Sequence, residues 1–189
     1  MMRARTAVLG TLVVGLAAFA MNGYAQQDKS KRPSPPAHAS CTFADGNTIT
    51  VDYSSPRMKG RKIYGGLVPW GQVWRVGANE GTTFVPTVDV VVGGKDVPAG
   101  NYTIDAIPNP DQWTFIVSKK TKNDKGGPVW GIPYPGEQYD LMRTDDVKLS
   151  QLSAPLEDFT ISFEPAGNVC TMNMDWETTH ASIVIQEKK

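Results

Sequence analysis

Apolar and polar residues alternate with a period of two along most of this chain. Clear examples are residues 49–54, 159–163, 170–176 and 181–186. This alternation is typical of β-strands that bury one face. By the same parity, we expect Cys170 to point inward, on the face that also carries the neighbouring methionines.

Short turn sequences separate these segments. Asp45-Gly46 stands between two strand-like runs and predicts a hairpin. Further turns are expected at residues 93–94, 98–100, 108–111, 165–168 and 177–179. No window shows a helical period longer than two turns. We therefore expect an all-β fold, a single antiparallel β-sandwich or jelly-roll-like domain of about nine to ten strands.

The N-terminus has the pattern of a secretory signal peptide. Arg3 and Arg5 precede an apolar run at residues 7–20, and small residues follow up to Ala25. We expect cleavage near Ala25, which would place the mature protein in the periplasm or outside the cell, with no stable membrane span. The alternative is a retained membrane anchor, for which the run is short compared with the roughly 20 residues of a span.

Residues 26–40 are polar and proline-rich, which favours an extended linker. Residues 41–189 would then form one domain of ordinary size. Cleavage of residues 1–25 removes two arginines and no acid, so it reduces the 19 basic residues to 17, against 19 acidic ones. This balance lacks the basic excess of a nucleic-acid binder. The sequence also lacks a basic amphipathic helix for a membrane surface.

The chain contains two cysteines, Cys41 and Cys170. Because we expect export, we expect them to form a disulfide. Two buried free thiols are the alternative. The sequence disfavours a catalytic role for Cys170, because no histidine is placed to activate it.

The sequence shows no motif for a metal, a cofactor or a familiar catalytic machinery. His38 and His180 stand far apart without clustered ligands, so we expect no transition metal and no cofactor. Calcium held by Asp145-Asp146 or by Asn123-Asp124 is an alternative to solvated turns. No nucleophile elbow, phosphate-binding loop or dinucleotide motif occurs.

Residues 54–80 are dense in arginine, tryptophan and glycine and suggest a ligand site. With one tryptophan from further along the chain, the candidate ligand-binding residues are Arg57, Arg61, Trp74, Arg75, Asn79, Glu80 and Trp130. Arginine and asparagine would supply donors, glutamate an acceptor and tryptophan an apolar wall. The alternative is a structural network, in which Arg75 pairs with Glu80, Asn79 caps a turn and the other two arginines bind loop carbonyls.

A long loop rich in glycine, proline and aromatic residues is expected at residues 120–139. It is a candidate lid for the arginine-rich site. Trp130 lies in this loop and should be the most exposed tryptophan, whereas Trp113 and Trp176 lie in strand-like runs and should be buried.

Several long motifs run through the chain. They are VDYSSP at 51–56, GRKIYGGLVP at 60–69, WRVGANE at 74–80, VPAGNYT at 97–103, WTFIV at 113–117, WG at 130–131, FTISF at 159–163 and MDWE at 174–177. Together they resemble the bacterial domain-of-unknown-function family 2911, over about residues 40–187. The resemblance implies an exported, β-rich bacterial domain. It supplies no catalytic residue, cofactor or substrate.

These residues support three hypotheses about function. The first, which we favour, is a non-enzymatic binding module for a small polar, anionic or carbohydrate ligand at the arginine-rich segment. The second is a carboxylate-dependent hydrolase with Glu80 or Asp52 as general base, the pair that a glycosidase would need. The third is a structural or protein-interaction domain of the cell envelope, which an exposed apolar patch would favour.

Overall fold

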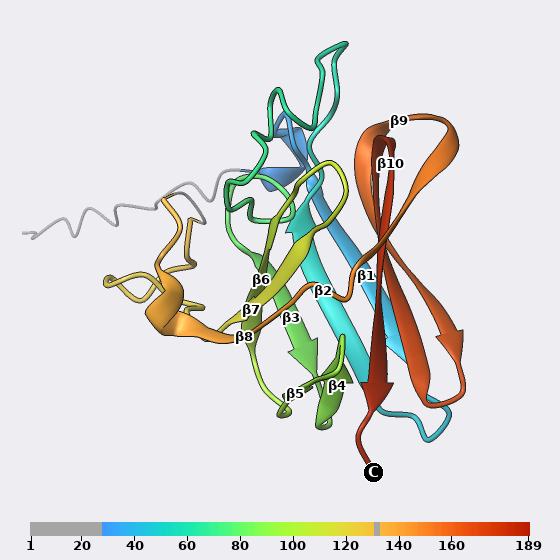
Figure 1. Cartoon of the computed structure of the whole chain (residues 1–189). Helices are drawn as coiled ribbons and strands as arrows, with labels where there is room; N and C mark the ends of the chain where they lie inside the picture. Colours follow the sequence, from blue (N-terminus) through green and yellow to red (C-terminus); the bar gives the residue numbers. More distant parts are fainter. Residues whose placement is uncertain (1–27, 131–132) are drawn as a thin grey trace, which may run out of the picture.

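A computed structural model describes residues 28–130 and 133–189 (Figure 1). The predicted signal peptide and its cleavage site lie outside these residues. The described chain forms ten strands and two short 3-10 helices. In order, these are η1 (Lys29–Lys31), β1 (Pro36–Thr42), β2 (Thr48–Ser54), β3 (Thr82–Pro86), β4 (Val90–Val92), β5 (Lys95–Val97), β6 (Tyr102–Ile107), β7 (Thr114–Ser118), η2 (Glu137–Tyr139), β8 (Asp140–Thr144), β9 (Lys148–Ala166) and β10 (Val169–Glu187).

The strands form two sheets that pack face to face. The first sheet has the order β1-β2-β3-β6-β7-β8, and the second has the order β5-β4-β10-β9. All strand pairs within the two sheets are antiparallel. This architecture confirms the predicted antiparallel β-sandwich.

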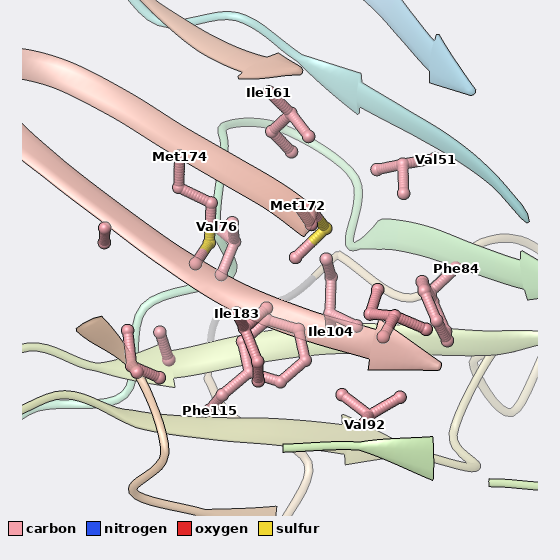
Figure 2. Close-up of a cluster of buried hydrophobic side chains, with 14 of the residues drawn as sticks. Val51, Val76, Phe84, Val92, Ile104, Phe115, Ile161, Met172, Met174 and Ile183 are labelled. Atoms are coloured by element: carbon pink, nitrogen blue, oxygen red, sulfur yellow. The ribbon is translucent and has the colours of Figure 1, made fainter. Parts of the chain in front are cut away.

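The core lies between the sheets and collects the inward-facing residue of every second position. Phe84, Ile104 and Phe115 from the first sheet face Met172 and Ile183 from the second (Figure 2). All five are at most 1% exposed. Full burial of one such side chain stabilises the fold by about 1.5–3 kcal/mol, so the alternating pattern provides the main driving force for assembly.

Cys41 on β1 and Cys170 on β10 form a disulfide, with their Cα atoms 6.3 Å apart. It confirms the predicted pairing. Because β1 belongs to the first sheet and β10 to the second, the bond joins the two layers covalently.

The boundary of the expected linker changes, because β1 already begins at Pro36. Residues 36–40 therefore belong to the sandwich, and Ala39 packs into the core in register with Val51. Pro36 is compatible with this arrangement, since it is the first residue of an edge strand and no neighbouring strand needs its missing N–H.

The turn expected at residues 177–179 is wrong. Residues 169–187 form one continuous strand, β10, with register shifts on either side of Glu177. In both steps β9 supplies more residues than β10: Asp175 to Glu177 faces Thr160 to Leu156, and Glu177 to Thr179 faces Leu156 to Gln151. The irregularity coincides with a change of parity in β10, whose buried apolar positions are even up to Trp176 and odd from Ala181 onward.

Residues 55–81 connect β2 to β3 and lie at the end of the sandwich opposite the β4–β5 hairpin (Figure 1). Part of this connection extends the first sheet. The backbone N–H of Gly71 donates to the carbonyl of Pro108 at 2.9 Å, and Trp74 and Ala106 exchange two backbone hydrogen bonds of 2.7 and 2.8 Å. These bonds hold the 55–81 connection beside the β6–β7 turn.

Candidate functional site

A cleft of about 500 Å³ opens beside the 55–81 connection. Its walls come from that connection, the β6–β7 turn, β9 and β10. The lining residues are Tyr64, Trp70, Asn109, Pro110, Asp111, Trp113, Leu149, Ser150, Gln151, Glu177 and Thr179. We call this the end cleft.

Two stacked aromatic rings form one wall of the end cleft. The ring of Trp70 lies 6.0 Å from that of Tyr64, with 20° between their planes. Trp70 is 38% exposed, whereas Tyr64 is only 3% exposed and packs on Trp113 at 5.0 Å. A Cβ at Gly65 would overlap the indole of Trp70, so glycine at this position allows the stack to form.

Glu177 lies where the pairing of β9 with β10 is irregular, and it lines the end cleft. Its side chain lines the cleft together with that of Thr179, two residues further along β10. Its backbone has φ +54°, in the left-handed region that non-glycine residues rarely adopt. Bulges commonly re-aim a side chain, and strained residues concentrate at functional sites.

The polar side chains of the end cleft do not stabilise the fold through hydrogen bonds or ion pairs. None of the side chains that line it makes a hydrogen bond or ion pair with any residue described in the structure. The hydroxyl of Tyr64 is buried without a partner. Burial, reinforced by the charges of Glu177 and Asp175, raises the pKa of Tyr64, so the hydroxyl stays protonated as a potential donor.

Two of the predicted site residues, the tryptophans, lie outside this cleft. Trp74 is part of the core: it packs on Phe159 at 5.0 Å and on Trp176 at 6.0 Å, and its indole N–H donates to the carbonyl of Gly77. Trp130 is 53% exposed and is the most exposed of the five tryptophans, as the sequence predicts.

The predicted arginine site corresponds to a smaller hollow of about 290 Å³, lined by Arg61, Trp74 and Arg75 among others. The Nη1 of Arg75 donates to the carbonyls of Asn79 and Trp130. Its Nε is buried without a partner in the described structure. Of the donor atoms of Arg75, Nη1 is therefore committed to loop carbonyls.

The other two arginines also stabilise the 55–81 connection. Arg61 donates from Nε to the carbonyl of Met58 at 3.0 Å and from Nη2 to that of Arg57 at 2.6 Å. This is the contact expected if Arg61 belongs to a structural network, in which the arginine binds loop carbonyls. Arg57 instead lies 3.2 Å from the carboxylate of Asp158 on β9, in an exposed ion pair.

The pair considered between Arg75 and Glu80 does not form. Glu80 accepts hydrogen bonds of 2.9 Å at both carboxylate oxygens from Nη1 of Arg32 and lies 3.3 Å from Nζ of Lys29. Asn79 donates to the carbonyl of Ser34. We call residues 28–35, which precede β1, the N-terminal strap. The side chains of Asn79 and Glu80 are therefore hydrogen-bonded to residues of the strap.

The carboxylates of the hydrolase hypothesis share a hollow of about 230 Å³, because Asp52 and Glu80 both line it. Both already have a basic side chain as partner. Asp52 lies 2.7 Å from Nδ1 of His38 on an exposed face. Burial raises the pKa of Glu80, but the bonds from Arg32 and Lys29 outweigh it and leave the pKa below its usual value. A lowered pKa makes the Glu80 carboxylate a weaker proton acceptor, and its two cationic partners occupy the oxygens that a general base would use.

Sequence reasoning missed one buried acid, Asp105. It lies on β6 opposite Ile116 and is 4% exposed. Burial, with a smaller contribution from Asp140, raises the pKa of Asp105 to about 7 against the attraction of Arg75. An aspartate in the middle of the strand-like run 102–107 was the available signal.

The residues 28–130 and 133–189 contain no cluster of three His, Cys, Asp or Glu side chains that could hold a metal ion. In the same residues, no helix has the length and apolar character needed to cross a membrane.

The fold and the end cleft together define a β-sandwich with a ligand-sized opening at one end. Residues 34–185 match the family described as "Protein of unknown function (DUF2911)", and the chain belongs to this family. The match confirms the resemblance seen in the sequence motifs. A search of curated proteins and a search of solved structures each found no match.

Proposed function

We propose that this protein is an exported, non-enzymatic binding module for a small carbohydrate-like ligand, and that the ligand occupies the end cleft. One contrast carries the proposal. Nη1 of Arg75 and the side chains of Asn79 and Glu80 already bind loop carbonyls or the N-terminal strap. The polar side chains that line the end cleft have no hydrogen-bond or ion-pair partner among the described residues. Unused polar groups beside an aromatic wall are the usual anatomy of a ligand site.

The dimensions and chemistry of the cleft support a sugar-sized ligand. A volume of about 500 Å³ lies within the range typical of small-molecule sites. The half-exposed indole of Trp70 offers a flat apolar surface, and its position is set by Tyr64 beneath it. Asn109, Gln151 and Thr179 add neutral hydrogen-bonding groups around the opening.

The disulfide supports action outside the cytoplasm, because disulfides persist mainly in oxidising compartments. Cleavage near Ala25 remains the predicted route of export.

A binding experiment with two tryptophan variants tests the proposal. Isothermal titration against a panel of neutral and charged oligosaccharides should give binding by the wild-type protein and by Trp130→Ala. The same panel should give at least about tenfold weaker binding by Trp70→Ala, which removes the stacking surface. Trp130→Ala is a matched control, because it also deletes an exposed indole but lies outside the cleft. Binding that depends on Trp130 and not on Trp70 would contradict the proposed location, and no binding to any sugar would contradict the proposed ligand.

A further inference from the structure

The charges of the end cleft are all of one sign. Asp111 and Glu177 line it, and no lysine, arginine or histidine of the described chain does. Neither carboxylate makes an ion pair or hydrogen bond with the described residues. Two unneutralised carboxylates in one cleft repel an anionic ligand and attract a cation.

Glu177 differs from an ordinary surface acid in how it is held. Its side chain lines the cleft where the pairing of β9 with β10 is irregular, and its backbone has the unfavourable φ of +54°. The only other carboxylate close to it along the strand, Asp175, lies 2.6 Å from Nδ1 of His180. Asp175 thus has a basic partner from its own strand. Glu177 has no such partner among the described residues and is available to a ligand.

The aromatic wall adds a second attraction for a cation. The faces of Trp70 and Tyr64 carry negative quadrupole charge and attract an ammonium group placed over them. The field of Glu177 already reaches this wall, since its charge contributes, after burial, to the raised pKa of Tyr64. The amide groups of Asn109 and Gln151 can donate hydrogen bonds to, and accept them from, the hydroxyl groups of a ligand.

From this arrangement we infer that the ligand of the end cleft is a cationic sugar, a polyhydroxylated ring that carries a protonated amine, with Glu177 as the partner of the ammonium group. The inference rests on the proposed function and narrows its ligand class. It replaces the anionic ligand considered from the sequence, because the hollow lined by Arg61 and Arg75 is separate from the end cleft.

Four probes separate the possibilities by titration calorimetry at mildly acidic pH and low salt. They are a glucosamine oligomer, the matching N-acetylglucosamine oligomer, a cellulose oligomer of the same length, and spermidine. We expect the glucosamine oligomer to bind at least about tenfold more tightly than the two neutral sugars. We also expect its affinity to fall as salt is added.

Glu177→Gln should remove the preference for the amine and leave binding of the neutral sugars nearly unchanged. Glu137→Gln is the matched control, because Glu137 is an exposed acid that pairs with Arg143 outside the cleft, and its loss should leave all affinities as they are. Circular dichroism and melting curves would verify that both variants fold.

The outcomes that overturn the inference differ from those that overturn the proposed function. Neutral sugars that bind as tightly as the glucosamine oligomer would refute the cationic ligand and leave a sugar-binding module in place. Spermidine that binds as tightly as the oligomer would refute the requirement for a sugar ring. No binding by any of the three sugars would remove the proposed function and this inference together.

Discussion

Arg32 and Glu80 lie 48 residues apart in the chain, and Nη1 of the arginine donates to both carboxylate oxygens of the glutamate at 2.9 Å. Arg32 belongs to the N-terminal strap and Glu80 to the 55–81 connection. Their side chains are only 18% and 22% exposed. This partly buried pair fastens the strap to the end of the sandwich, where a solvated surface pair would contribute little.

Glu80→Gln should lower the free energy of unfolding by about 1–2 kcal/mol at pH 7, since it weakens charged hydrogen bonds that are partly screened by solvent. The pKa of Glu80 is lowered in the fold, so the contribution is present above the pKa of the unfolded chain and is lost as pH falls through the lower folded value. Urea denaturation of Glu80→Gln, Arg32→Ala and the double variant would measure the coupling. Asp124→Asn, at a 97% exposed side chain, is the control. Strictly additive effects would show that the two residues do not stabilise each other.

Gly65→Ala should displace Trp70, whereas Gly60→Ala should not. Both glycines have positive φ, +76° and +68°, so both substitutions strain the backbone by about 1–2 kcal/mol. A Cβ at Gly60 meets nothing within 4 Å, but one at Gly65 overlaps the indole. Tryptophan fluorescence should therefore shift only in Gly65→Ala, and sugar binding should weaken with it. Equal emission spectra for the two variants would mean that the stack adapts to the added methyl group.

Asp105 should make the protein less stable as pH rises from about 4 to about 8. The folded pKa of about 7 is above the unfolded value, so the folded state binds the proton more tightly, and this advantage is lost as pH rises towards 7. A difference of roughly three pKa units corresponds to about 4 kcal/mol. Asp105→Asn should flatten the pH dependence in this range and be more stable than the wild type at pH 8. Unfolding free energies of wild type, Asp105→Asn and the exposed control Asp96→Asn would test this, and parallel pH curves for all three would contradict it.

Loss of the Cys41–Cys170 bond should destabilise the domain by about 5 kcal/mol, because the loop it closes spans 129 residues. The estimate follows from the chain entropy of the unfolded state. The urea midpoint of the oxidised protein, of the reduced protein and of a double Cys→Ser variant would measure the effect. The same midpoint in all three would show that the bond adds nothing to stability.

The strands could be predicted from the sequence because the period of two is a local signal. Runs such as residues 159–163 and 181–186 show their buried face without reference to the rest of the chain. The bulge at Glu177 was mistaken for a turn, although the change from even to odd buried positions was visible. A turn and an irregularity within a strand can both change which alternate positions are buried. The two are distinguished only by the pairing with β9, which continues on both sides of Glu177.

The site was harder to predict because its contacts are long-range. The sequence places Arg75 near Glu80, but the partner of Glu80 is Arg32, from a segment expected to be a linker. The end cleft joins residues from around positions 64–70, 109–113, 149–151 and 177–179. No spacing rule connects four segments of this kind, so the cleft becomes visible only when the fold brings them together.

The covalent link between β1 and β10 also determines what happens when the chain is cut. Exposed loops are the preferred sites of proteolytic nicking, and the long 119–139 connection lies between the two cysteines in sequence. After a single cut there, the two fragments would still be tethered to each other and would still share one core. A protein built in this way can survive a protease that opens one of its loops.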